Sequence, residues 1–163
     1  MAKLSAESVR KENMITLASA HAVYIETARR LAGQKGLEAV GEANRLHGLE
    51  LGEEAVRAGY MRKGDLHSLF EMFDGSSPYF GFELSVIKSS DDVLEMKVTY
   101  CPWIETFKKK GAGKDICTWL CKMDEGIGQA VDPTVRMTLL KCMMRGDEFC
   151  IYRWEKHADD RKT

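Results

Sequence analysis

The first third of the chain repeats apolar residues with a helical period. Apolar residues recur every three or four positions from Ser5 to Ala32 and again from Gly36 to Gly59. This is the spacing of an amphipathic helix. Gly33 separates the two runs, and glycine commonly ends a helix. The sequence therefore predicts two helices, the first ending at Gly33 and the second at Gly59.

Four glycines of the second run fall on nearly one helix face. They are Gly41, Gly48, Gly52 and Gly59, at spacings of seven, four and seven. A glycine inside a helix costs about 1 kcal/mol relative to alanine, so a row of them is expected where another backbone approaches closely. We expect that partner to be the first helix or a second subunit, which would form a homodimer.

A short third helix is predicted after Asp65, a suitable N-cap residue. Its apolar positions are Leu66, Leu69, Phe70 and Phe73. The turn-forming run 74–78 is expected to end it. The pattern then changes to a period of two. Residues 79–88 and 93–101 read as strands, and the polar run 89–92 reads as the hairpin turn between them.

The remaining chain predicts two more helices, 103–110 and 115–131, and a second hairpin formed by 135–143 and 149–154 around Gly146. The predicted fold class is α+β, with N-terminal helices packed on a four-stranded antiparallel sheet made of two hairpins with helices between them. We expect a single domain. Residues 1–75 are mainly helical, 76–156 form the hairpin–helices–hairpin unit, and 157–163 form a frayed tail.

Composition narrows the function classes. The 163 residues are 44% hydrophobic and 30% charged, and 24 basic residues against 25 acidic ones give a net charge of -1. This balance argues against nucleic-acid binding. The longest apolar runs are too short to span a membrane. The N-terminus lacks a secretory signal, so we predict a cytoplasmic protein with reduced thiols.

Five cysteines are the first candidates for chemistry. If Gly146 is the centre of the second hairpin, Cys142 and Cys150 are directly opposite, and opposed Cβ atoms lie about 4.5 to 5.5 Å apart. Such a pair could share a metal, activate one another, or simply pack as small apolar groups. A one-residue bulge would instead place them on opposite faces.

The three other cysteines lie on the predicted helix and strand. Cys117 and Cys121 are four residues apart, and Asp124 continues their stripe. The alternative is that these thiols only flank a buried apolar stripe. Cys101 ends a strand immediately before a helix, where a helix N-terminus can lower the pKa of a thiol. A structural cysteine at a strand end is the alternative.

Zinc and histidine chemistry are also open from the residues. Tetrahedral zinc takes four ligands, and Cys142, Cys150, Cys117 and either Glu95 or Cys101 could supply them, although the spacings are not those of CxxC zinc motifs. His21 and His47 lie on or near apolar helix stripes. Each is a candidate general base, with a packed core histidine as the alternative.

Several of these residues together resemble the L-2-amino-thiazoline-4-carboxylic acid hydrolase family. The motifs are the strand end 98–102 with Cys101-Pro102, the helical Cys117 and Asp124, and the closing hairpin 146–152. The resemblance implies hydrolytic opening of a small sulfur heterocycle to an N-carbamoyl cysteine.

The closing hairpin 141–150 is also similar to the vinyl-reductase type of small-molecule-binding domain. In such sensor domains two cysteines at this spacing, an earlier cysteine and a glutamate hold zinc beside an effector pocket. Carried over, the resemblance implies zinc ligation by Cys142, Cys150, Cys117 and Glu95.

Our first hypothesis is a cysteine-dependent hydrolase of a small cyclic C–N bond. Cys101 attacks or positions the substrate, Cys150 and the nearby Asp147 complete the site, and Asp124 or His47 moves protons. The alternative is a non-enzymatic small-molecule-binding or sensor module with structural zinc and a pocket lined by aromatic residues. These are Phe80, Phe82, Tyr100 and Trp103. A third interpretation is a scaffold subunit that dimerises through the glycine face.

Overall fold

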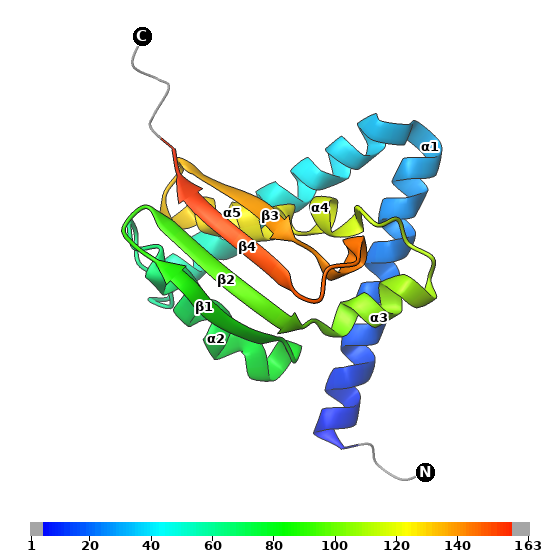
Figure 1. The fold of residues 1–163 in the computed structure, drawn as a ribbon, viewed down its shortest axis with the longest axis horizontal. Coiled ribbons are helices and arrows are strands. Elements are labelled where there is room, and N and C mark those ends of the chain that lie inside the picture. Colours follow the sequence, from blue (N-terminus) through cyan, green and yellow to red (C-terminus); the bar gives the residue numbers. More distant parts are fainter. Residues whose placement is uncertain (1–4, 158–163) are drawn as a thin grey trace.

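The computed structural model describes residues 5–157. Most of the predicted tail, residues 158–163, lies outside the described residues. The chain begins with α1 (Ala6–Arg57), which bends at Gly33, where φ is +56° and ψ is -135°. Glycine adopts a positive φ without steric cost. The two predicted helices are therefore the two arms of α1, drawn in blue and cyan in Figure 1.

The glycine face of α1 packs against α5 (Lys122–Val131) of the same chain. A Cβ atom on Gly48 would overlap the carbonyl oxygen of Met123, and one on Gly126 of α5 would overlap that of Arg45. The two backbones are in contact because both helices carry glycine there. The expected partner, the first helix or a second subunit, is thus corrected to α5. Gly41 faces the Trp119 ring of α4 (Ile116–Leu120) instead, and a homodimer stays a prediction.

α2 (His67–Phe80) is longer than the sequence indicates. The run 74–78, expected to end the helix, lies inside it. The hydroxyls of Ser76 and Ser77 both donate to the carbonyl of Phe73, at 2.9 and 3.1 Å. Serine bonded back to the preceding turn is compatible with helix. The helix ends only at Gly81, which takes φ +76°, so the first strand starts later than predicted.

The sheet confirms the predicted fold class. Its strands are β1 (Glu83–Ser89), β2 (Val93–Tyr100), β3 (Val135–Lys141) and β4 (Cys150–Lys156). They are antiparallel in the order β1-β2-β4-β3, so the two hairpins join through β2 and β4. On the buried face of that junction, Val98 pairs with Cys150 and Met96 pairs with Tyr152. Helices cover this face (Figure 1).

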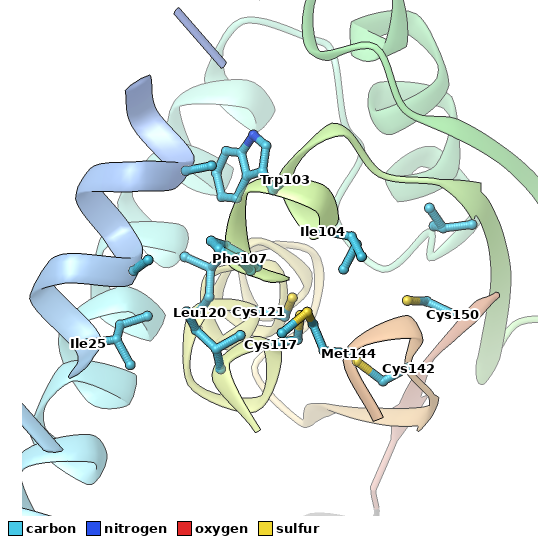
Figure 2. Packing of buried hydrophobic residues seen from close by; sticks show 14 of the residues in the cluster. Ile25, Trp103, Ile104, Phe107, Cys117, Leu120, Cys121, Cys142, Met144 and Cys150 are labelled. Atoms are coloured by element: carbon cyan, nitrogen blue, oxygen red, sulfur yellow. The ribbon is translucent and has the colours of Figure 1, made fainter. Parts of the chain in front are cut away.

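The helices between the hairpins are α3 (Pro102–Lys109), α4 (Ile116–Leu120) and α5. The predicted helix 115–131 is divided at Cys121, where φ is -73° and ψ is 3°. A buried cluster joins α1, α3 and α4 to the tip of the second hairpin, and Figure 2 shows its residues, including Ile25, Phe107 and Leu120. None of the described helices is long and apolar enough to cross a membrane.

Candidate functional site

An apolar cavity of about 260 Å³ lies between the helices and the sheet. Aliphatic and aromatic side chains form most of its wall, and α1, α2, α3, α4, α5 and β4 all contribute. The lining residues are Leu51, Ala55, Met72, Phe73, Ser76, Phe80, Phe82, Cys101, Trp103, Ile104, Phe107, Cys117, Leu120, Cys121, Met123, Asp124, Ile127 and Tyr152. Asp124 is the only charged side chain among these described lining residues. We call this cavity the pocket.

Asp124 is held at the start of α5. Its backbone N–H donates to the carbonyl of Cys121 at 3.1 Å, and its own carbonyl accepts the Trp154 indole N–H at 3.0 Å. Burial among apolar side chains raises the pKa of its carboxyl to about 7, although a hydrogen bond with Cys121 opposes the shift. Near neutral pH the group therefore exchanges its proton readily. That is the property of a general acid or base.

Cys101 lines the same pocket at the junction of β2 and α3. Burial raises the pKa of its thiol to about 12. Hydrogen bonds from the backbone N–H groups of Trp103 and Ile104 act in the opposite direction. The helix N-terminus expected to lower this pKa is present, but the loss of solvation outweighs it. At neutral pH the Cys101 thiol is therefore protonated.

Cys121 and Tyr152 form the wall beside Asp124. The Cys121 sulfur lies 3.5 Å from the Tyr152 hydroxyl oxygen. Burial raises the pKa of Tyr152, and the neighbouring Cys121 and Asp124 reinforce this shift. Sequence reasoning did not select Tyr152 as a site residue. The sequence feature that could have identified Tyr152 is the alternation of side chains along a strand, which puts Tyr152 on the same face as Cys150 and Trp154.

Three thiols form a separate buried cluster at the tip of the second hairpin. Cys142 and Cys150 lie side by side as expected from the turn, and Figure 2 shows both near Cys117. The thiols of Cys117 and Cys150 hydrogen-bond to the sulfur of Cys142, which lowers the pKa of Cys142 and raises that of Cys150. The Met143 N–H also points at the Cys150 sulfur, at 3.4 Å. Only Cys117 of the three lines the pocket.

Two of the predicted catalytic residues, Asp147 and His47, are not among the residues that line the pocket. Asp147 accepts the Cys142 backbone N–H at 2.7 Å and so closes the hairpin turn. His47 lies on the outer side of α1 with 59% of its side chain exposed, 3.8 Å from Glu50. Phe80, Phe82 and Trp103 are among the lining residues, as expected. Tyr100 is not and is half exposed.

Of the predicted zinc ligands, Glu95 lies apart from the three clustered thiols. Glu95 pairs with Arg153 across the β2–β4 ladder, and its carboxylate accepts the guanidinium N–H at 2.7 Å. Strand alternation puts both on the sheet face opposite Cys150. Glu95 therefore cannot join Cys117, Cys142 and Cys150. Within residues 5–157, no group of three or more His, Cys, Asp or Glu side chains is arranged to hold a metal ion.

Together, the fold and its cavity define an α+β protein with an apolar pocket between its helices and its sheet. The chain belongs to the L-2-amino-thiazoline-4-carboxylic acid hydrolase family, whose model matches residues 11–154. This confirms the family resemblance noted in the sequence. No curated protein matches the chain by sequence.

Two solved structures share the fold. One is trafficking protein particle complex subunit 3 from Naegleria fowleri, covalently bound to palmitic acid. Its TM-score is 0.63 at 15% identity, covering 91% of this chain and 97% of that one. The other is the phenol-responsive sensory domain of the transcription activator PoxR with phenol. Its TM-score is 0.62 at 15% identity, covering 98% of this chain and 79% of that one. At this identity the likenesses show the fold alone.

Proposed function

We propose that the protein hydrolyses a small cyclic amidine in the pocket and that Asp124 moves the proton. The observation that carries this proposal is the Asp124 carboxyl group, which has a pKa near 7. It is the only charged side chain among the described residues that line the apolar pocket. An enzyme working near neutral pH needs an acid–base group with a pKa in this range. Membership of a hydrolase family supplies the reaction class.

The proposed reaction balances with water as the only co-reactant. The Asp124 carboxylate takes a proton from water while the water oxygen bonds to the amidine carbon. As the water oxygen bonds to carbon, the C=N electron pair moves onto the ring nitrogen. In a 2-amino-thiazoline ring the bond from that carbon to sulfur then breaks, sulfur leaves with the electron pair and Asp124 returns the proton to it, while the second water proton passes from oxygen to the ring nitrogen as the carbonyl forms. The product is a urea with a free thiol. This route keeps both C–N bonds and breaks the C–S bond, whereas the sequence-based hypothesis named a C–N bond.

Cys101 has a secondary part in this proposal. With a pKa near 12, its thiol would have to lose a proton before it could attack, and Asp124 is too weak a base to remove it efficiently. Direct attack by water needs no such step. We therefore assign Cys101 to the pocket wall, and its role as nucleophile stays a prediction for experiment.

The test compares three variants, Asp124→Asn, Cys101→Ser and Asp91→Asn, with the unaltered protein. The substrates are 2-amino-2-thiazoline and its 4-carboxylate. Chromatography follows the ring-opened product. Asp91 is an exposed carboxylate in the first hairpin turn and serves as the matched control. Loss of a general base lowers turnover by about 100-fold to 10,000-fold, which is expected for Asp124→Asn only. If Cys101→Ser abolishes turnover while Asp124→Asn retains it, the reaction is instead a cysteine hydrolysis.

A second candidate is a non-enzymatic small-molecule-binding module. The apolar and aromatic wall favours it, because such walls hold aromatic rings without any chemistry. A fold like that of a phenol-responsive sensory domain adds support. Phenol titrated into the protein and followed by calorimetry tests this candidate. Saturable binding of phenol, together with no turnover of either thiazoline, would favour the binding module over the hydrolase.

A further inference from the structure

The tip of the second hairpin holds a cluster of sulfur atoms that the proposed hydrolysis does not use. The thiols of Cys117 and Cys150 hydrogen-bond to the sulfur of Cys142, and Figure 2 shows all three residues in the buried cluster. All three are free thiols. Cys142 therefore has two sulfur neighbours, one on α4 and one on β4, and the backbone geometry favours the neighbour on β4.

Cys142 and Cys150 have the backbone geometry of a disulfide pair. Lys141 pairs with Ile151, so Cys142 and Cys150 occupy the next opposed positions. The Cys142 N–H donates to the Asp147 carboxylate at 2.7 Å and its carbonyl accepts the Asp147 N–H at 3.3 Å, so its backbone groups bond within the turn. The two cysteines thus form a non-hydrogen-bonded pair, in which the Cα atoms of antiparallel strands lie about 4.5 Å apart. This separation suits a disulfide, which spans about 4.4 to 6.8 Å between Cα atoms.

Backbone amides of the turn hold both sulfurs in place. The Met143 N–H points at the Cys150 sulfur at 3.4 Å, and the N–H groups of Met144 and Arg145 donate to the Cys142 sulfur. These three consecutive residues form one 3₁₀ turn, so both sulfurs face the same short segment. A bond between the sulfurs therefore requires rotation of two side chains rather than movement of either strand. N–H donors also favour the thiolate, which is the form of cysteine that reacts with hydroperoxides.

The pair lies at the edge of the molecule. Each of the two cysteines is 1% exposed, but residues 145–148 of the turn between them are exposed. Exposed turns open locally at a low cost in free energy. Hydrogen peroxide is close to water in size, so local opening of this turn gives it access to the two sulfurs.

We propose that Cys142 and Cys150 are a redox modification site, which a hydroperoxide converts into a reversible disulfide. In the first step the Cys142 sulfur attacks one peroxide oxygen and the O–O bond breaks. Cys142 becomes a sulfenic acid, while the other oxygen takes the thiol proton and leaves as water or an alcohol. In the second step the Cys150 sulfur attacks the Cys142 sulfur, the S–O bond breaks, and that oxygen leaves as water with the proton of Cys150. Two thiols and one hydroperoxide thus give one disulfide, one water and one further water or alcohol.

The experiment uses the full chain, reduced, freed of metal with a chelator and treated with an equimolar amount of hydrogen peroxide. The remaining thiols are alkylated in urea, and the chain is digested with trypsin. Trypsin cuts after Arg145, so Cys142 and Cys150 separate into peptides 142–145 and 146–153. We expect mass spectrometry to show these two peptides linked, and dithiothreitol to release them. Two of the five alkylatable thiols should be lost before that reduction.

Three results would overturn the proposal. A link from 142–145 to peptide 115–122, which carries Cys117 and Cys121, would mean that a cysteine of the helical layer supplies the partner. Sulfinic or sulfonic acid without any link would mean that the two sulfurs do not meet. Five reactive thiols after the treatment would mean that this site is not oxidised. The chain unfolded in urea, where no pair is held together, should give several different links.

Cys150→Ala and Cys117→Ala are a matched pair of variants, because both thiols contact Cys142 and both are buried. Cys150→Ala should lose the linked peptides and leave a sulfenic acid on Cys142, which dimedone traps. Cys117→Ala should keep the link. Loss of the link in Cys117→Ala, or no dimedone adduct in Cys150→Ala, would contradict the two proposed steps. Circular dichroism checks that both variants fold, and the unaltered protein decides the proposal if either does not.

Discussion

The Cys121 sulfur lies 3.5 Å from the Tyr152 hydroxyl oxygen. Cys121 stands at the junction of α4 and α5, and Tyr152 stands in the middle of β4, so this contact joins the helical layer to the sheet. Cys121 also hydrogen-bonds to Asp124. Cys121, Tyr152 and Asp124 therefore form one polar cluster in an apolar wall. Contacts from both the helices and the sheet position Asp124 in this cluster.

The first prediction concerns this polar cluster. Tyr152→Phe removes the hydroxyl but keeps the ring, which stacks on Trp154 with 5.8 Å between ring centroids. We expect a loss of stability of about 1 kcal/mol, the usual value for one hydrogen bond, and turnover reduced much less than by Asp124→Asn. Urea unfolding and turnover measure the two effects. Tyr100→Phe, at an exposed tyrosine, is the control. Turnover as low as in Asp124→Asn would assign Tyr152 a direct role in the reaction.

The second prediction concerns the pH dependence of stability. The pKa of Asp124 is raised from 3.8 to about 7 in the folded protein because burial disfavours its charge. The folded state therefore holds a proton that the unfolded state has lost between these pH values. Stability should fall as pH rises through that window, relative to a variant without the group.

Asp124→Asn is that variant. It should match the unaltered protein below about pH 4 and be more stable above about pH 7, by on the order of 4 kcal/mol at most. Urea unfolding at about pH 4 and about pH 8 measures the difference, with Asp91→Asn as the exposed control. An equal difference at the two pH values would show that Asp124 does not titrate in this range.

The third prediction concerns thiol reactivity. Cys101 is the only one of the five free cysteines that is not fully buried. Its raised pKa leaves very little thiolate at neutral pH, so iodoacetamide should label it about 100-fold more slowly than a free cysteine, with the rate rising steeply above about pH 9. Mass spectrometry of timed samples measures this, with urea-unfolded protein as the control. Rapid labelling of Cys101 at neutral pH would support its role as nucleophile.

Local patterns predicted much of the fold. The bend at Gly33, both hairpins and the side-by-side Cys142 and Cys150 follow from neighbouring residues, since a turn fixes the register of the two strands it joins. The sequence pattern did not predict that α2 continues through residues 74–78. Its serines bond back to the helix, and the same residues are equally common in turns.

The site was harder to predict because it depends on elements far apart in the chain. Alternation placed Glu95 opposite Leu94 and Met96, but the pairing of β2 with β4 decides which face carries Cys150. No short turn connects these two strands, so the sequence does not state their register. The pocket has the same origin, since Asp124 meets Tyr152 only after α5 has packed on the sheet.

The last prediction concerns the glycine contact between α1 and α5. Alanine at Gly126 places a methyl group against the backbone of Arg45 and Leu49, where neither helix can give way without moving. We expect Gly126→Ala to destabilise the protein by about 1 to 3 kcal/mol, the usual cost of overpacking a core. Urea unfolding followed by circular dichroism measures this change.

Gly75→Ala is the matched control because Gly75 also lies in a helix, α2, and a Cβ atom there meets nothing within 4 Å. This variant should be stabilised by up to about 1 kcal/mol, since alanine is the better helix former. Similar effects of both substitutions would mean that α1 and α5 do not touch at Gly126. Asp124 lies two residues before Gly126 on the same helix, so displacement of α5 in Gly126→Ala should also lower turnover, whereas Gly75→Ala should leave it unchanged.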